Sequence, residues 1–66
     1  MKNNIRIERA RKDITQATLA EMIGVSRQTI NTIESGRYVP STVLALKLSR
    51  IFDIPVNELF ELEDGD

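Results

Sequence analysis

The stretch QATLAEMIGVSRQTINTIESGRYVP, residues 16–40, decides the fold of this chain. It contains a helical segment, a tight turn at Gly24, a second helical segment, and an exit marked by Gly36 and Pro40. Glycine takes a left-handed backbone conformation at little steric cost, which allows it to end a helix abruptly. Because the link is so short, the two helices must pack against each other. This order of parts predicts a helix-turn-helix.

The rest of the chain has the same helical character. Each apolar segment follows a residue that favours a helix N-terminus, in chain order Asn3 or Asn4, Thr15, Ser26, Pro40-Ser41 and Pro55. No stretch shows the sustained alternation of a strand. We therefore expect an all-α, compact five-helix domain, with helices at about residues 3–12, 16–23, 27–35, 42–52 and 55–62, and no strands. This domain spans residues 1–66, with residues 62–66 as an acidic, frayed tail.

The composition excludes several classes of protein. The chain has 66 residues, enough for one domain, and contains neither Cys nor His. Disulfides, cysteine metal sites and the commonest general base are therefore absent. No apolar run approaches the roughly 18 residues of a membrane span, and the N-terminus has no apolar signal region. We expect a cytoplasmic protein that needs no metal or cofactor.

The charges are distributed unevenly along the chain. Residues 1–50 hold all nine basic residues and four acidic ones, a net charge of +5, whereas residues 51–66 hold six acidic residues and no basic one. A basic body with an acidic end can suit a nucleic-acid contact on one side. The same pattern is also compatible with ordinary solvated surface charge.

The helical segment 27–35 has an outward face suited to DNA. Ile30 and Ile33 define its inward side when residues are placed about 100° apart. The other side carries amides and hydroxyls with a single arginine, whereas a merely solvated face usually carries Lys and Glu. Such side chains hydrogen-bond base edges in the major groove. The alternative is plain exposure to solvent for the residues of this face, Arg27, Gln28, Asn31, Thr32 and Ser35.

One carboxylate of this segment, Glu34, falls on the inner half of the helix. A buried carboxylate without a partner is costly. Arg9, on the first helical segment, is the candidate partner, and the pair would fix how that segment braces the outward-facing helix. In the alternative, Glu34 reaches water at the surface.

These residues resemble one known family. The pattern is Gln16-x-x-Leu19-Ala20-x-x-x-Gly24-Val25-Ser26-Arg27-Gln28-x-Ile30-x-x-x-Glu34-x-Gly36-Arg37-x-x-Pro40-Ser41. It is similar to the Cro/C1-type (XRE-like) helix-turn-helix transcriptional regulators, which have a lambda-repressor-like fold. The resemblance runs from residue 5 to residue 62. Small stand-alone prokaryotic members end in a Pro-Val-x-x-Leu-Phe segment, as residues 55–60 do here.

The resemblance implies a role for each matching position. The first two residues of the recognition helix and those one turn later contact bases, which corresponds to Arg27, Gln28, Asn31 and Thr32. The glutamine that opens the second helix and the loop after the third contact phosphates, which corresponds to Gln16, Arg37 and Tyr38. Ser26 lies at a helix N-terminus, a ready anion site. The family also pairs the inward glutamate with the arginine of the first helix, in agreement with Arg9 and Glu34.

The chain departs from the family pattern at three positions. Glu8 stands where the family often has Leu, so the start of the first helix can pack differently. Asp13 replaces the usual Gly before the second helix, and aspartate adopts a left-handed backbone at modest cost. Thr18 replaces a Glu that would complete a capping box. None of these changes lies on the DNA face.

The C-terminal segment has more apolar residues than one short helix can hide. Some must close the core, and the rest can form a two-fold interface, as in similar proteins. We expect a homodimer through Val56, Leu59, Phe60 and Leu62. Val43 and Leu46 form a second apolar strip that could join this interface. In the alternative, all of these residues pack internally.

Two functions from different classes fit these observations. The first is a sequence-specific transcriptional regulator, most simply a repressor, which binds an inverted repeat of double-stranded DNA as a homodimer. The second is an adaptor or antitoxin-like protein whose partner binds the acidic C-terminal segment. An enzyme is disfavoured because the chain has no His, no Cys and no glycine-rich phosphate loop.

Overall fold

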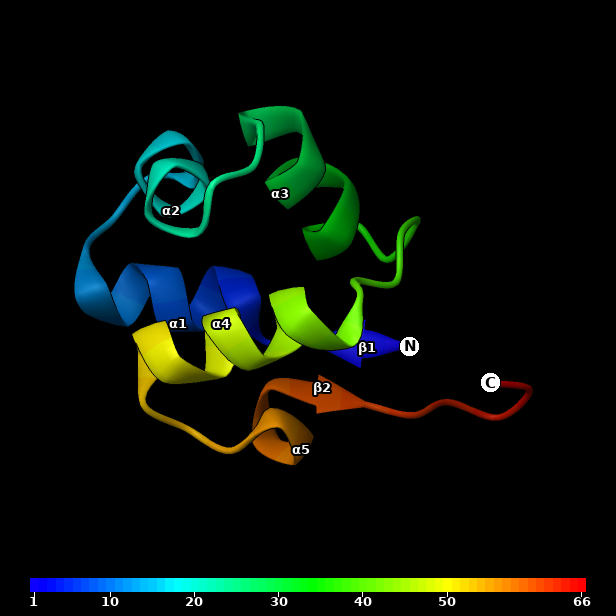
Figure 1. The fold of residues 1–66 in the computed structure, drawn as a ribbon. Coiled ribbons are helices and arrows are strands. Elements are labelled where there is room, and N and C mark those ends of the chain that lie inside the picture. Colours follow the sequence, from blue (N-terminus) through cyan, green and yellow to red (C-terminus); the bar gives the residue numbers. More distant parts are fainter.

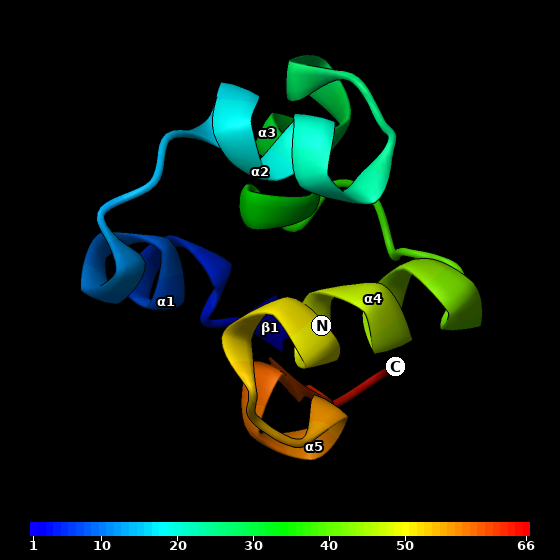
Figure 2. The ribbon, with the colours of Figure 1, turned by 60° about the vertical axis from the view of Figure 1, so that its left-hand side comes forward.

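The computed structural model describes all 66 residues and contains five helices and two short strands (Figure 1). In chain order the elements are β1 (Lys2–Asn3), α1 (Ile5–Lys12), α2 (Gln16–Ile23), α3 (Arg27–Glu34), α4 (Thr42–Phe52), α5 (Val56–Leu59) and β2 (Phe60–Glu61). In both views α2 and α3 form one end of the molecule, whereas α5 lies at the other (Figures 1 and 2). The predicted helix-turn-helix is therefore confirmed as α2, its turn and α3.

Hydroxyl caps start three of the helices, as the sequence predicts. The Thr15 hydroxyl oxygen accepts a hydrogen bond from the Thr18 N–H at 3.0 Å. Ser26 and Ser41 cap α3 and α4 in the same way, at 3.1 and 3.2 Å. Each bond satisfies a backbone donor that the helix itself leaves free. Asn4 occupies the N-cap position of α1, but its side chain makes no capping bond.

Left-handed residues end three helices. Gly24 has φ +75° at the end of α2, and Asp13 has φ +55° at the end of α1, as expected. Asp53, with φ +54°, ends α4 in the same way, although its sequence context gave no indication of this role. Aspartate tolerates this conformation better than most residues do, which explains its use at two helix ends.

The prediction of a fifth helix to residue 62 without any strand was wrong. The helix α5 ends at Leu59, and Phe60 adopts an extended conformation with φ −121° and ψ 142°. Phe60 then pairs with Asn3, and Glu61 pairs with Lys2, in an antiparallel register. Two-residue strands are too short for a pattern of alternation, and their pairing joins the two ends of the chain. No local signal could therefore have predicted them.

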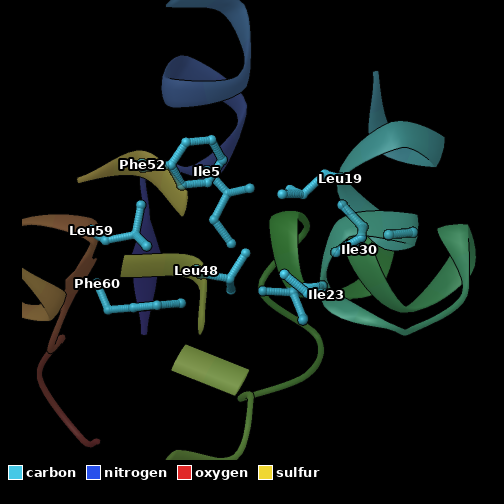
Figure 3. Close-up of a cluster of buried hydrophobic side chains, with 10 residues drawn as sticks. Ile5, Leu19, Ile23, Ile30, Leu48, Phe52, Leu59 and Phe60 are labelled. Carbon is cyan, nitrogen blue, oxygen red and sulfur yellow. The ribbon is translucent and has the colours of Figure 1, made fainter. Parts of the chain in front are cut away.

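A single apolar core receives side chains from every helix (Figure 3). Ten hydrophobic residues are buried, namely Ile5, Leu19, Ala20, Ile23, Ile30, Ile33, Leu48, Phe52, Leu59 and Phe60.

This core corrects the expected dimer interface. Leu59 is fully buried and Phe60 is 7% exposed, so both side chains pack inside one protomer. A domain this small buries too little surface to spare large apolar side chains from its own core. Leu62 is 78% exposed, and Val56 is half-buried, so only these two of the four predicted residues have surface to offer.

The acidic end of the chain has defined contacts in the structure. The Met1 amino group lies 2.9 Å from Oε1 of Glu63 and 3.1 Å from Oδ2 of Asp66. The Asp66 carboxylate also accepts the Glu63 N–H at 2.7 Å, which closes a turn. The residues expected to fray are thus placed beside the N-terminus. None of the helices has the length and apolar character that crossing a membrane requires.

A pair of leucine substitutions separates core from surface in this segment. Leu59→Ala should lower the free energy of unfolding by about 2–5 kcal/mol, because it leaves a cavity in the core. Leu62→Ala should change it by less than about 0.5 kcal/mol, because its side chain is exposed. Urea unfolding followed by circular dichroism measures both. Equal effects of the two substitutions would contradict the assignment of Leu59 to the core.

Candidate nucleic-acid interface

The helix α3 presents a polar face away from the core. Ile30 and Ile33 are buried, whereas Arg27, Gln28 and Asn31 are exposed. The buried and exposed faces of α3 are therefore the ones that the helical spacing of its apolar residues predicts. The exposed face carries one arginine and two amides, groups that can bind base edges.

Two threonines of α3 have part of their hydrogen-bonding capacity occupied. The Thr32 hydroxyl donates to the Thr29 carbonyl oxygen at 2.9 Å, so it offers a partner only its methyl group and its lone pairs. The Thr29 hydroxyl is 2.9 Å from the Ser26 hydroxyl. Both threonines are half-buried. Contacts from Thr32 to DNA are thus limited to accepting a hydrogen bond or touching a thymine methyl group.

Open hollows flank α3 on two sides. One, of about 520 Å³, is lined by Arg9, Asp13, Ile14, Thr15, Gln16, Ala17 and Arg27, where the ends of α1, α2 and α3 meet. The other, of about 330 Å³, is lined by Thr29, Thr32, Arg37 and Tyr38. Gln16, predicted to bind phosphate, lines the first hollow beside Arg27, and Arg37 and Tyr38 line the second beside Thr32. Each hollow contains an arginine, and arginine suits a phosphate.

The structure brings Arg9 and Glu34 together in a bidentate ion pair. Arg9 Nε lies 2.7 Å from Glu34 Oε2, and Arg9 Nη2 lies 3.2 Å from Oε1. The Glu34 side chain is only 1% exposed and that of Arg9 is 16% exposed. Arg9 also donates through Nη1 to the Ile14 carbonyl oxygen at 3.1 Å, which ties the link between α1 and α2 to the pair. The pair thus joins α1 to the C-terminal end of α3.

Gln16 completes this polar cluster from α2. Its Nε2 donates to Glu34 Oε1 at 3.2 Å and to Asn31 Oδ1 at 3.4 Å. Its bonds therefore reach the second half of α3. Gln16, the first residue of α2, therefore donates to both the buried carboxylate of Glu34 and Asn31, a candidate for base contact.

The surroundings of Glu34 lower its pKa. Burial by itself raises the pKa of this carboxyl, because it disfavours the charged form. The hydrogen bonds from Arg9 and Gln16 and the charges of Arg9 and Arg6 outweigh that effect, so the pKa lies below its ordinary value of 4.5. Glu34 is consequently ionised throughout the neutral range.

Asn3, considered from the sequence only as a helix cap, has a role at α3 that the sequence did not predict. Its Nδ2 donates to the Ile33 carbonyl oxygen at 2.8 Å, and its Oδ1 accepts the Ile5 N–H at 3.3 Å. Asn3 also pairs with Phe60 in the strand ladder. It therefore connects the two-stranded pair to the C-terminal end of α3. No sequence signal could have found it, because its partner is a main-chain carbonyl.

This arrangement defines a helix-turn-helix DNA-binding domain: α2 packs on α3, the polar face of α3 is free, and hollows flank it. Residues 5–59 match the family model described as helix-turn-helix, and the chain belongs to this family of Cro/C1-type regulators. No group of three or more acidic, histidine or cysteine residues could hold a metal ion.

Relatives and solved structures agree with this assignment. The chain is 44% identical to an uncharacterised HTH-type transcriptional regulator of Methanocaldococcus jannaschii over 66 residues, all of both chains. It is 45% identical to the uncharacterised regulator YgzD of Bacillus subtilis over 64 residues, 97% of each.

Among solved structures, the chain is similar to the restriction-modification controller protein C.AhdI of Aeromonas hydrophila, with a TM-score of 0.75 and 38% identity over 85% of this chain and 81% of that one. It is also similar to the SOS-response transcriptional repressor LexA of Eubacterium rectale, with a TM-score of 0.81 and 32% identity. That match covers 96% of this chain and 67% of the other. The protein is therefore a DNA-binding transcriptional regulator and not an enzyme.

The buried ion pair predicts a specific dependence of stability on pH. Because the folded-state pKa of Glu34 is depressed, its ionised form contributes stability above about pH 4.5, and this contribution is lost as the pH falls through the folded-state value. Glu34→Gln should cost roughly 3 kcal/mol at pH 7 and progressively less below pH 4.5. Urea unfolding from pH 7 to pH 3 measures the difference. Glu21→Gln, at an exposed carboxylate of α2 that belongs to no ion pair, is the control and should cost under about 0.5 kcal/mol. A cost for Glu34→Gln that is independent of pH would refute this account.

Neighbouring asparagines provide a matched test of the contact to α3. Asn3→Ala should cost about 1 kcal/mol, because it removes the bond to the Ile33 carbonyl, and it should speed amide exchange at the end of α3. Asn4→Ala removes a bond to the Glu58 carbonyl and should affect exchange only around α5. Hydrogen exchange followed by NMR separates the two. Unchanged exchange at Gly36 and Arg37 in Asn3→Ala would show that the bond does not hold α3.

Proposed function

We propose that this regulator is a repressor that binds an inverted-repeat operator as a homodimer, with α3 of each protomer in the major groove of one half-site. The observation that carries the proposal is the free polar face of α3, which is exposed while the opposite face is locked into the core. A recognition helix held rigidly in this way reads bases with little ordering on binding.

The proposed contacts divide by chemistry. Base contacts belong to α3 and are made by Arg27, Gln28, Asn31 and Thr32. Phosphate contacts come from the helix N-termini and from the loop after α3, and are made by Gln16, Ser26, Arg37 and Tyr38. In each hollow a proposed phosphate contact lies beside a proposed base contact, Gln16 beside Arg27 and Arg37 beside Thr32, which supports the proposal since phosphates flank the bases in a groove.

The dimer interface that we propose is centred on α4. Val43 and Leu46 lie one helical turn apart on α4 and are 64% and 56% exposed, and Val39 in the link before α4 is 61% exposed, so exposed apolar side chains are grouped here. Leu46 and Val39 also line an apolar hollow of about 260 Å³ together with Val56. A second copy related by a two-fold axis would cover this surface, and the exposed Leu62 can contribute from the C-terminal segment.

Repression is the simplest outcome of such binding, since a bound dimer blocks access to the DNA it covers. One structural relative of the chain is itself named a transcriptional repressor. The acidic C-terminal segment remains the alternative partner surface, and protection of that segment rather than of the α3 face would favour an adaptor.

Selection from a random duplex library at 100–150 mM salt tests the proposal, because sequence-blind binding is weak there. We expect an inverted repeat with half-sites about 34–36 Å apart.

Gln28→Ala should cost about 1–3 kcal/mol on that site and relax one base position. Arg37→Ala should weaken binding to all sequences alike and reduce the salt slope by about one unit. If the folded wild-type protein enriches no sequence, the proposal of an inverted-repeat operator is refuted.

The oligomeric state is tested by substitutions at two equally exposed apolar residues. Leu46→Asp should convert the dimer to a monomer, because it places a charge in the proposed interface. Met22→Asp is the control, since Met22 is 54% exposed on α2, outside that interface. Sedimentation equilibrium gives the masses of both variants and of the wild type. Loss of the dimer in Met22→Asp, or its persistence in Leu46→Asp, would place the interface elsewhere.

A further inference from the structure

A second arginine of α1 lies at the buried carboxylate of Glu34. Arg6 Nε is 3.6 Å from Glu34 Oε1, and the Arg6 side chain is 77% exposed. This distance is that of an ion pair and is too long for a hydrogen bond, so Arg6 donates none of its guanidinium N–H groups to the protein. The guanidinium therefore lies at the surface beside Glu34, with its donors available to another molecule.

Arg9, in contrast, is committed to the protein. Its Nε and Nη2 donate to Glu34, and its Nη1 donates to the Ile14 carbonyl oxygen. Its side chain is only 16% exposed. One arginine is enough to balance the single negative charge of Glu34. The positive charge that remains in this cluster is therefore that of Arg6, and it lies at the surface.

Arg6 lies on the side of α3 where α2 begins. Gln16 Nε2 and Arg6 Nε are 3.2 and 3.6 Å from the same Glu34 oxygen, which makes the two donors close neighbours. The Gln16 amide is also 3.4 Å from Oδ1 of Asn31, an exposed residue of α3. Arg6 is therefore at the edge of the face proposed for base contacts, beside a residue proposed to bind phosphate.

We propose that Arg6 binds a phosphate of the DNA strand that passes the start of α2, so that α1 is part of the nucleic-acid interface. The planar guanidinium has a fork of N–H donors that matches phosphate oxygens, and its attraction to Glu34 keeps it near α3 before DNA binds. Such a contact positions the protein on the duplex and carries no sequence information. This inference rests on the proposed placement of α3 in the major groove.

The salt dependence of DNA binding tests this assignment. Fluorescence anisotropy gives the Kd of each variant for the selected operator and for a random duplex, between about 50 and 300 mM salt. Arg6→Gln should lower the slope of log Kd against log salt by about one unit and weaken both duplexes by the same factor, roughly three- to tenfold near 100 mM salt. Arg6→Lys keeps the charge, so its slope should equal that of the wild type, whereas part of the affinity is lost with the fork.

Arg11→Gln is the matched control. Arg11 belongs to the same helix and is 71% exposed, but it lies about 140° around the helix axis from Arg6, away from Glu34. Its substitution removes the same charge and should leave the slope unchanged. Arg6→Gln should unfold at nearly the same urea concentration as the wild type, because Arg9 and Gln16 still donate to Glu34.

Neutral phosphate analogues locate the contact. A methylphosphonate is placed at one backbone position of the operator at a time. One position in each half-site should weaken binding of the wild type but not of Arg6→Gln, whereas the positions that depend on Arg37 should weaken both.

A slope for Arg6→Gln equal to that of the wild type, or an equal fall of the slope in Arg11→Gln, would overturn the inference and leave the operator intact. If the wild type enriches no sequence, the operator proposal fails. The slopes on the random duplex then still decide whether Arg6 binds phosphate.

Discussion

The placement of α3 depends on one buried charge. Glu34 lies at the C-terminal end of α3, where the helix dipole disfavours a negative charge, and its side chain is 1% exposed. Without partners, a carboxylate at this place would be strongly destabilising. Arg9 of α1 and Gln16 of α2 both donate to it, so three helices meet at one group. Because these donors have fixed positions, α3 satisfies Glu34 in one orientation only, and that orientation sets which face it turns outward.

The small size of the domain explains where its apolar residues are used. With ten buried hydrophobic side chains, the core draws on every helix and also on the strand residue Phe60. This demand removes Leu59 and Phe60 from any surface role. Part of the apolar area that remains exposed lies on α4 and on the link before it, at Val39, Val43 and Leu46. The core and the proposed interface therefore both need apolar residues. Those nearest the centre of the domain are buried in the core.

Local signals predicted most of the fold, and non-local contacts were missed. Thr15, Ser26 and Gly24 act through atoms a few residues away, so their roles can be inferred from the chain itself. The inward position of Glu34 follows from helical spacing, which is why its partner could be sought among the arginines. Asn3, by contrast, bonds a carbonyl 30 residues away, and any residue type offers such an acceptor. The strand pair was missed for the same reason, because it joins the two ends of the chain.

The two chain ends lie beside the C-terminal end of α3 and hold it in place. Asn3 binds the Ile33 carbonyl while its backbone pairs with Phe60, and the Met1 amino group contacts Glu63. The polar cluster at Glu34 holds the same helix from α1 and α2. Held on both sides, α3 loses its conformational freedom on folding rather than on meeting DNA. Less ordering then opposes association with DNA.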